Sequence, residues 1–330
     1  MALVETVRGP IDAAGLGVTL MHEHVFVLNE EIRRNYPATW DEEQRTEDAV
    51  AKLNELHERG CTSIADPTVI GLGRDIERIA KVAARTELNI IAAAGIYTYN
   101  DVPLYFQYRG AERAGTGNTA ASDPMTRMFI ADITEGIAGT GIKAAFLKCA
   151  IEEPGLTSGV ERVMRAVARA HLATGAPITV HTHPASRSGL TALQVLGEEG
   201  ADLTRVVLGH SGDTADVDHL AELADQGCLL GMDRFGLDIL LPLEQRVATV
   251  AALCARGYAD RMVLSHDASC HIDWFSPEQI ARFAPSWHYG HLFDDVLPAL
   301  RERGVSETQL DTMLVGNPRR YFSGPSSQGS

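Results

Sequence analysis

The sequence predicts a closed barrel of eight parallel β-strands, each followed by a helix, in a single domain spanning residues 1–330. Three observations lead to this α/β fold class: short apolar runs alternate with helical patterns, the alternation occurs eight times, and no Pro-, Gly- or Ser-rich linker interrupts it. Near-continuous apolar strands are typical of a parallel sheet covered on both faces, and eight units favour a (β/α)8 TIM barrel over an open sheet. An open sheet with one or two misassigned strands is the alternative. Residues 323–330, SGPSSQGS, are expected to form a flexible tail.

The first unit shows how the elements are recognised. Residues 18–24 form an apolar run, and residues 42–58 place Ala49, Leu53 and Leu56 on one stripe of a helix. The same pattern then repeats along the chain. The later strands are predicted at 61–66, 89–97, 143–151, 177–183, 205–210, 228–235 and 261–267, and the later helices at 75–85, 124–137, 159–174, 189–199, 214–225 and 243–256, before a terminal helical region.

The composition excludes several classes of protein. The 330 residues include 29 Lys and Arg against 44 Asp and Glu, a formal net charge of −15, and 45% are hydrophobic. An acidic balance argues against nucleic acid and anionic membranes as partners, because both attract clustered cations. No apolar run reaches the roughly 20 residues of a membrane helix, and no signal peptide is recognisable, so a cytoplasmic protein is expected. The five cysteines form no Cys-x-x-Cys pair that would indicate zinc or redox chemistry.

Metal-capable residues fall at the carboxyl ends of five predicted strands. They are His22 and His24 on the first strand, Lys148 on the fourth, His181 on the fifth, His210 on the sixth and Asp267 on the eighth. In a parallel barrel these ends open on one face, so residues far apart in sequence converge there. A lone His-x-His or a single strand lysine is usually structural, but the coincidence at five strand ends indicates a metal site. His183 shares a face with His181, and spacing alone leaves either as the ligand.

Lys148 indicates that the site is binuclear. An ammonium beside four histidines and a divalent ion would be desolvated and repelled, so its pKa would fall and leave a neutral amine. A neutral amine can take up carbon dioxide as a carbamate, an anionic ligand able to bridge two ions. Zinc, cobalt, iron and manganese all suit such ligands, and hydroxide held between two ions is a nucleophile at neutral pH. The remaining ligands divide into His22, His24 and Asp267 around one ion and His181 and His210 around the other.

Six motifs occur in order along the predicted strands. They are MHEHV at the first, LKCA at the fourth, HTHP at the fifth, GHSGDT at the sixth, GMDRFG at the seventh and SHDASCHIDW at the eighth. From Val18 to Phe322 the sequence thereby resembles the phosphotriesterase-like lactonases of the amidohydrolase superfamily. The resemblance implies hydrolysis of lactones, including N-acyl-homoserine lactones as in quorum quenching, with weaker activity on organophosphate triesters, and a homodimer. It also implies a binuclear centre whose ligands are His22, His24, carboxylated Lys148, His181 rather than His183, His210 and Asp267.

Further candidates lie on the same face. Asp213 can orient a ligand, carry protons away or cap a helix, and Arg234 can hold a substrate carbonyl or form a structural ion pair with Asp213 or Asp233. Tyr99 resembles the tyrosine that distinguishes the lactonases from the true phosphotriesterases. By resemblance an apolar channel for an acyl chain is lined by Leu237, Ile272 and Trp274, for which ordinary loop packing is the alternative.

The favoured hypothesis is a metal-dependent lactonase. Hydroxide bridged between the ions attacks the lactone carbonyl, and Asp267 accepts the proton and passes it to the leaving alkoxide. A dedicated phosphotriesterase is the runner-up, disfavoured by Tyr99 and the DRFG stretch. A mononuclear deaminase has no use for Lys148. A catalytically inactive metal-binding barrel is the alternative from another class, and the intact ligand set argues against it.

Overall fold

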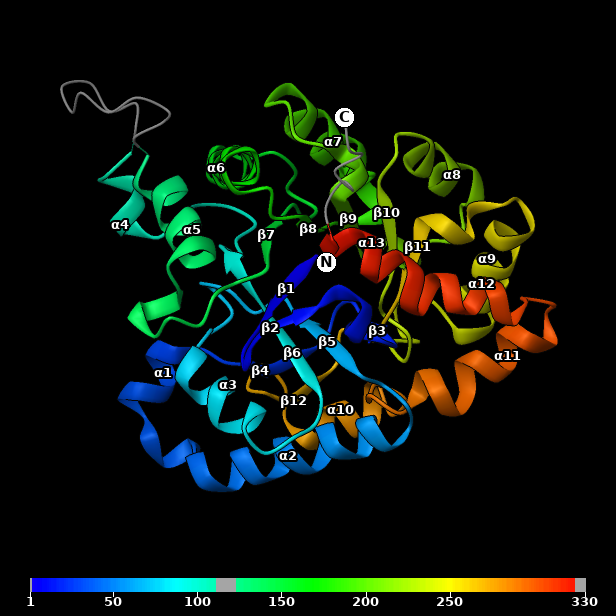
Figure 1. The fold of residues 1–330 in the computed structure, drawn as a ribbon, viewed down its shortest axis with the longest axis horizontal. Helices are drawn as coiled ribbons and strands as arrows, with labels where there is room; N and C mark the ends of the chain where they lie inside the picture. The colour runs from blue at the N-terminus through cyan, green and yellow to red at the C-terminus, as the bar shows by residue number, and fades with distance from the viewer. Residues whose placement is uncertain (1, 111–122, 324–330) are drawn as a thin grey trace.

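The computed structural model describes residues 2–110 and 123–323, and within them eight parallel strands form a ring surrounded by helices (Figure 1). Each strand pairs in parallel with the next one in this sheet, as Ala150 does with His181 in the register of the fourth and fifth. The carboxyl ends of the strands therefore share one face of the ring. The strands are β3 (Thr19–Leu20), β5 (Ser63–Asp66), β6 (Asn89–Gly95), β7 (Phe146–Ala150), β8 (Ile178–His181), β9 (Val206–Gly209), β10 (Leu229–Met232) and β11 (Met262–Leu264).

The ring closes where the first and last strands meet. The Met21 N–H donates to the carbonyl of Leu264 at 3.5 Å, and the Asp267 N–H donates to the carbonyl of His22 at 3.0 Å. Beyond this point the first strand continues as β4 (His24–Val27), which pairs in parallel with β12 (Ser269–Ile272). The first predicted strand is thus two short strands, and the predicted eighth strand ends at Leu264 instead of residue 267.

Glu23, at the division of the first strand, is fully buried. Its Oε1 accepts hydrogen bonds from Ser265 Oγ at 3.0 Å and from the backbone N–H and ring Nδ1 of His266 at 2.8 and 2.6 Å. Its Oε2 accepts from the Ala268 N–H at 3.0 Å. Four donors from the loop after β11 therefore satisfy a carboxylate on the first strand, and this closes the seam.

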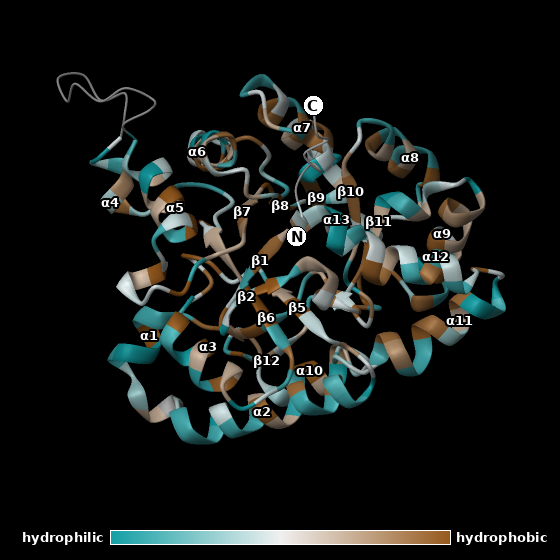
Figure 2. Cartoon of the chain, in the orientation of Figure 1, coloured by the Kyte–Doolittle hydropathy of each residue, from teal (hydrophilic) through white to brown (hydrophobic). Residues whose placement is uncertain are grey.

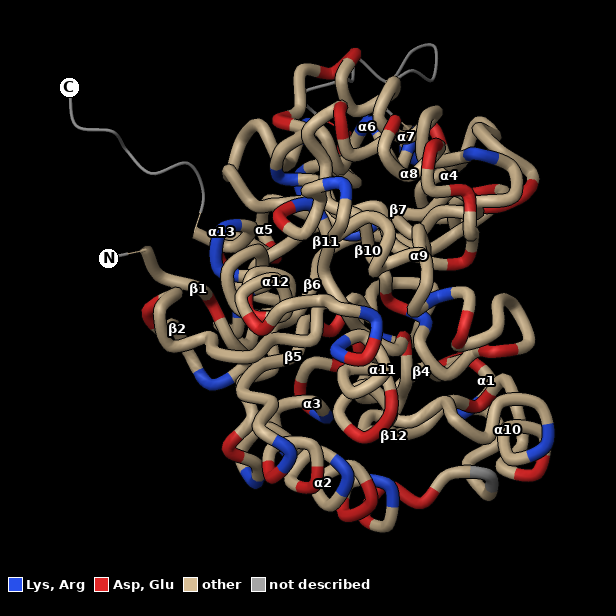
Figure 3. The backbone as a smooth tube through the Cα atoms, turned by 90° about the vertical axis from the view of Figure 1, so that its right-hand side faces the viewer, with Lys and Arg blue, Asp and Glu red and all other residues tan. Residues whose placement is uncertain are grey.

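Amphipathic helices cover the ring. In the longest N-terminal helix, α2, buried residues such as Ala49, Leu53 and Leu56 face the sheet, while hydrophilic residues lie along the outer edge of the molecule (Figure 2). Acidic and basic residues are interspersed over these outer faces (Figure 3). The helices are α1 (Glu30–Asn35), α2 (Glu42–Glu58), α3 (Ile76–Ala83), α4 (Leu104–Gln107), α5 (Pro124–Thr134), α6 (Ser158–Thr174), α7 (Ser188–Glu198), α8 (Val217–Asp225), α9 (Leu243–Ala255), α10 (Pro277–Phe283), α11 (Leu297–Glu302), α12 (Glu307–Asp311) and α13 (Asn317–Ser323).

The amino end of the barrel is filled by the two ends of the chain. An antiparallel hairpin of β1 (Leu3–Thr6) and β2 (Gly9–Asp12), which sequence patterning did not predict, lies across this end (Figure 1). Val4, Tyr321 and Phe322 pack there against Phe146 and other barrel-interior residues. Since this end is sealed by apolar side chains, the opposite end is left to carry polar chemistry.

The predicted fold class is confirmed, and most predicted elements agree with the observed ones to within a few residues. All five cysteines are buried free thiols. Ser323 ends α13, and the rest of the tail predicted at 323–330 lies outside the described residues. Among the helices of the described ranges, none is both long and apolar enough to span a bilayer.

We predict that Glu23→Gln destabilises the fold by about 2–4 kcal/mol, because an amide NH₂ would face N–H donors in a fully buried place. The free energy of unfolding, measured in urea, tests this. The exposed Glu58 provides a matched control, and Glu58→Gln should change stability by no more than about 0.5 kcal/mol. Equal effects of the two substitutions would show that the seam does not depend on Glu23.

Candidate metal centre

The carboxyl ends of the strands surround a cavity of about 290 Å³. One end of this cavity is polar and the rest is apolar. Five of the six predicted ligands line the polar end, and the sixth, His210, is fully buried behind His181. The lining consists of His22, His24, Lys148, His181, Arg234 and Asp267 at the polar end, with Val27, Leu72, Tyr97, Leu237, Ile239, Leu240, Ser269, Ile272, Trp274, Phe275 and Trp287 around them.

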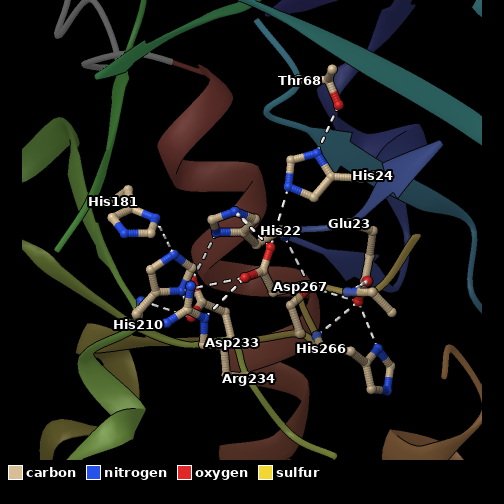
Figure 4. Close-up of polar contacts among 12 residues, drawn as sticks. His22, Glu23, His24, Thr68, His181, His210, Asp233, Arg234, His266 and Asp267 are labelled. Carbon is tan, nitrogen blue, oxygen red and sulfur yellow. Dashed lines mark hydrogen bonds and ion pairs between the residues drawn. The ribbon is translucent and has the colours of Figure 1, made fainter. Parts of the chain in front are cut away.

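His22, His24 and Asp267 form a first cluster at the barrel seam (Figure 4). Asp267 Oδ1 lies 3.4 Å from His22 Nε2 and 3.2 Å from His24 Nε2. One ligand atom from each residue falls within 4.8 Å of the others. Two imidazoles and a carboxylate at this spacing can share one cation.

His181 and His210 form a second cluster, with His181 Nδ1 2.8 Å from His210 Nε2. The outer nitrogen of each ring meets a carboxylate: His181 Nε2 donates to Glu152, and His210 Nδ1 donates to Asp233 Oδ1 at 3.0 Å. Each inner nitrogen therefore carries a lone pair. Two lone pairs at this distance repel each other, and a cation between them relieves the repulsion. His183, the alternative ligand from spacing, instead contacts Ser186 and Ser188.

Asp233, which follows β10, joins the two clusters. Its Oδ2 accepts from His22 Nδ1 at 2.9 Å, and its Oδ1 also accepts from the His210 N–H at 2.7 Å. Because it occupies the outer nitrogens of both rings, Asp233 acts as a support that leaves the inner nitrogens free. A Cβ at Gly231 would lie 2.6 Å from Asp233 Oδ2, so the glycine makes room for this carboxylate.

His24 is oriented from the neighbouring strand. Thr68 Oγ1 donates to Asp66 Oδ1 at 2.5 Å, so His24 Nδ1 donates to Thr68 Oγ1 at 2.7 Å. This arrangement again points the inner nitrogen, Nε2, at Asp267. The supporting roles of Thr68, Asp66 and Asp233 were not predicted from the sequence. The sequence offered one signal for such residues, a polar side chain at the end of an apolar strand, and both Asp66 and Asp233 occupy such a position.

Two of the predicted ligands have unusual backbone conformations. His210 has φ of 66° and Asp267 has φ of 57°, both in the left-handed region that non-glycine residues seldom occupy. Such strain costs about 1–3 kcal/mol and persists only where surrounding contacts impose it. Here the Asp267 N–H is held by the carbonyl of His22, and the His210 N–H by Asp233.

Lys148 lines the cavity together with members of both clusters, adds by its charge to the effect of burial in lowering the pKa of His22 and of His181, and is almost completely buried, at 1% exposure. Within residues 2–110 and 123–323, its Nζ has neither an ion-pair nor a hydrogen-bond partner. Burial lowers its pKa to about 8 despite the opposing influence of Asp267 and Asp233. About a tenth of the side chain is therefore the neutral amine at pH 7, far more than for a lysine with its ordinary pKa, and the neutral amine is the form that reacts with carbon dioxide.

These residues fit a divalent cation in each cluster. Four imidazoles present unprotonated nitrogens once neutral, Asp267 adds a carboxylate, and Lys148 lies unpaired among them. Burial lowers the pKa values of His22, His181 and His210, which favours the neutral form that binds metals. The chemistry of the donors is thus suited to zinc, cobalt, iron or manganese alike.

Arg234 and Asp213 form an ion-pair chain that ends at Asp267. Arg234 Nε donates to Asp267 Oδ2 at 2.9 Å, and its Nη1 donates to Asp213 Oδ2 at 3.0 Å. Although burial opposes it, the surrounding histidines and Arg234 hold the pKa of Asp267 well below its usual range. Of the partners considered from sequence, Arg234 thus has Asp213 and not Asp233.

The apolar wall differs from the sequence expectation at one position. Tyr97, not Tyr99, lines the cavity, and its ring packs edge-on against His181 with centroids 5.2 Å apart. Tyr99 lies further out, 44% exposed, and contacts the ring of Tyr97. The sequence predicted Tyr97 as the last residue of a strand 89–97 and Tyr99 in the loop after it. In the structure β6 ends at Gly95, so both tyrosines lie in the loop. Of the expected channel residues, the lining contains Leu237, Ile272 and Trp274.

Comparison with known proteins finds likeness over nearly the whole chain. The sequence model of the phosphotriesterase family matches residues 2–322. A phosphotriesterase homology protein of Mycobacterium tuberculosis is 57% identical over 323 residues, 98% of either chain. The solved structure of the phosphotriesterase from the same organism covers 98% of both chains with a TM-score of 0.94.

Two more distant proteins extend the comparison. An aryldialkylphosphatase of Saccharolobus solfataricus is 39% identical over 318 residues, covering 96% of this chain and 98% of that protein. A second solved structure is 32% identical in sequence to this chain; it comes from the molecular engineering of organophosphate hydrolysis activity from a weak promiscuous lactonase template. Its TM-score is 0.88, and the match covers 98% of this chain and all of the other.

In protein freed of metal by a chelator, we predict that His24 and His181 titrate in opposite directions. Burial favours neutral His24, but the nearby carboxylates of Asp267 and Asp66 outweigh it and raise its pKa to about 9. Burial lowers the pKa of His181 to about 4 against the bond to Glu152. At pH 7, His24 is then protonated and His181 neutral, which ring ¹⁵N shifts of histidine-labelled protein would report in a pH titration.

Two variants sharpen this titration. Asp267→Asn should lower the pKa of His24, because the carboxylate that stabilises the imidazolium is gone. Asp294→Asn, at a half-exposed carboxylate remote from the cavity, should leave both values unchanged. Titration of both rings near the ordinary value of about 6.5 would contradict the network described above.

Proposed function

Because the chain belongs to the phosphotriesterase family, whose match covers nearly all of it, we propose that it is a binuclear metal-dependent lactonase. Its substrates would include N-acyl-homoserine lactones, as in quorum quenching, with weaker activity on organophosphate triesters. The observation that carries this proposal is the shape of the cavity, in which a metal-capable polar end adjoins a long apolar wall. A lactone head and an acyl chain match these two parts.

The proposed ligands fall into the same two clusters that the structure shows. His22, His24 and Asp267 would hold one ion and His181 and His210 the other, with a Lys148 carbamate between. When bound, the two ions supply Lewis acidity toward the substrate carbonyl and lower the pKa of water. The protein contributes the support of Asp233 and Glu152 behind the imidazoles and the enclosure of the polar end.

Asp267 is the proposed proton carrier. Its carboxylate is ionised, faces the cavity and is held by Arg234, so it can accept the proton of the attacking water. The water oxygen bonds to the carbonyl carbon, the ring C–O bond breaks, and the proton returns to the leaving alkoxide. The products are an alcohol and a carboxylic acid in one open-chain molecule, and the acid releases the second proton of the water to the solvent to become a carboxylate.

Tyr97 is the proposed substrate contact. Its phenol has no hydrogen-bond partner among the residues the structure describes, and burial raises its pKa, so at neutral pH it is a free donor facing the polar end. A lactone is flat near its carbonyl and can lie beside this ring. A phosphotriester is tetrahedral and needs room on all sides, so Tyr97 should favour the lactone.

A dedicated phosphotriesterase is the second candidate, favoured by the likeness to the aryldialkylphosphatase of S. solfataricus. The crowding of the polar end by Tyr97 and by the Arg234 side chain argues against it. A metal-binding barrel without activity would use the same ligands, and turnover measured with and without a chelator distinguishes it from an enzyme. The homodimer implied by resemblance stays a prediction.

We predict that Lys148→Ala lowers the metal content below the roughly two ions per chain expected of the wild type and reduces activity about 100-fold or more. Added short carboxylic acid and metal should restore part of both. Lys148→Arg is the matched control, because its permanent cation repels the ions and should not be rescued. Elemental analysis and turnover measure the outcome. Two ions and full activity in Lys148→Arg would exclude the carbamate.

We predict that Tyr97→Phe lowers kcat/KM for lactones about tenfold, the value of one hydrogen bond in the transition state, and changes triester hydrolysis less. Tyr99→Phe is the matched control, since Tyr99 lies outside the cavity lining, and should change neither. The assay compares a short lactone, a long-chain acyl-homoserine lactone and a paraoxon-type triester. If the wild type prefers the triester, it is a phosphotriesterase; if chelation leaves every rate unchanged, the metal mechanism is wrong.

The same assay tests the apolar wall. Burial of each additional methylene is worth about 0.8 kcal/mol, so longer acyl chains should bind better until the channel is filled. Trp274→Ala should weaken this dependence on chain length while leaving short-lactone turnover nearly unchanged. An equal loss for short and long chains would place Trp274 outside the acyl channel.

A further inference from the structure

The loop of residues 236–242, between β10 and α9, forms one side of the apolar wall. It supplies Leu237, Ile239 and Leu240 to the cavity. Ile239 is 65% exposed and Leu240 is 52% exposed. Side-chain burial therefore contributes little to holding this part of the loop, and its position must depend on backbone contacts.

The start of the loop is fixed by close packing. Phe235 is buried, and Gly236, with φ of 97°, lies so near the carbonyl of Ser286 that a Cβ there would approach it to 2.3 Å. Within the loop, the Leu240 N–H donates to the carbonyl of Leu237 at 3.0 Å. These contacts hold the first part of the loop. The last part, which leads into α9, must be held by other groups.

Arg246, on the first turns of α9, holds the return. Its side chain is 2% exposed. Its Nε donates to the carbonyl of Leu241 at 2.9 Å and its Nη2 to that of Leu237 at 3.2 Å. Its Nη1 donates to the carbonyl of Gly212 at 2.7 Å, in the loop after β9. Of the side chains in the described ranges, no other donates to a carbonyl of residues 236–242.

The same guanidinium is connected to the polar end of the cavity by a chain of ion pairs. Arg246 Nη2 forms an ion pair with Asp213 Oδ1 at 2.7 Å, and Asp213 in turn holds Arg234, which contacts Asp267. A planar fork of five donors can satisfy carbonyls and a carboxylate at once, which an ammonium cannot do. Arg246 thus connects the apolar wall to the ion-pair chain at the polar end.

We propose that Arg246 is a positioning residue that sets the apolar wall and thereby the preference for acyl-chain length. The substrate class rests on the function proposed above, but the anchoring of the loop does not. When the fork is lost, residues 237–241 should move away from the cavity more often, and the wall should contact long chains less. The ligands lie on other elements and should still bind their ions as long as a cation remains beside Asp213 to support the ion-pair chain to Asp267.

Two substitutions separate the parts of this role. Arg246→Lys keeps a cation for Asp213 but cannot bond all three carbonyls, and Arg246→Met removes both functions. Arg256→Met is the matched control, because Arg256 lies just beyond the same helix, about half exposed, and pairs with Asp218 on the surface. If Arg246→Met fails to fold, Arg246→Lys alone decides the question.

The first measurement is amide hydrogen exchange of the peptide containing residues 237–241, which needs no substrate. Both Arg246 variants should exchange about tenfold faster there, the equivalent of one or two lost hydrogen bonds, while Arg256→Met should match the wild type. Unchanged exchange in Arg246→Lys would overturn the proposal. Faster exchange everywhere in the barrel would also overturn it, because Arg246 would then be a general stabilising residue.

The second measurement is the ratio of kcat/KM for a long-chain and a short-chain acyl-homoserine lactone, with metal content determined alongside. In Arg246→Lys the ratio should fall about tenfold through a higher KM for the long chain, with kcat for the short chain and metal content nearly unchanged. An equal loss on both substrates would exclude a role in chain-length preference. If the wild type cleaves neither lactone, the proposed function fails, while hydrogen exchange still tests the anchor.

Discussion

The buried carboxylate of Glu23 is the contact on which the rest of this structure depends. It lies between two proposed ligands of the first strand, His22 and His24, and accepts hydrogen bonds from residues on either side of a third, Asp267. A barrel must join its first strand to its last, and here that joint also carries the first cluster of proposed ligands, His22, His24 and Asp267. Any change in closure would therefore change the distances among these three residues.

At the polar end of the cavity, the orientation of each imidazole ring is fixed by a hydrogen bond to a residue behind it. The inner imidazole nitrogens face the cavity because their outer nitrogens are occupied by Asp233, Glu152 and Thr68. In a water-excluded interior such bonds are strong, and leaving one of them unmade is costly. Lys148 is the exception, a buried amine without a hydrogen-bond or ion-pair partner in the part of the chain that the structure describes. This lack of a partner is consistent with the proposed role of Lys148 as a metal ligand, because a permanent ion pair to the amine would compete with that role.

The apolar side of the cavity follows different physics. Its walls come from the loops after β6, β10 and β12, which carry Tyr97, Leu237 and Trp274. Loops of this kind gain little from their own burial, and Trp274 is 45% exposed. Their positions depend on a few backbone anchors such as Gly236 and Arg246. Chemistry and selectivity thus reside on parts of the molecule with different rigidity, the first on strand ends and the second on anchored loops.

The sequence by itself determined the barrel and the positions of the six metal-capable residues. Strand and helix periodicities are local, and in a parallel barrel the carboxyl ends of all strands share a face whatever the loops do. Only the tertiary structure decided that Glu23 contacts His266, 243 positions away, that Asp233 supports two histidines, and that Tyr97 and not Tyr99 faces the cavity. These facts depend on how a strand ends, how a loop turns and which distant groups meet. No local period in the chain encodes them, because they arise only when the seam has closed and the buried polar groups have found their partners.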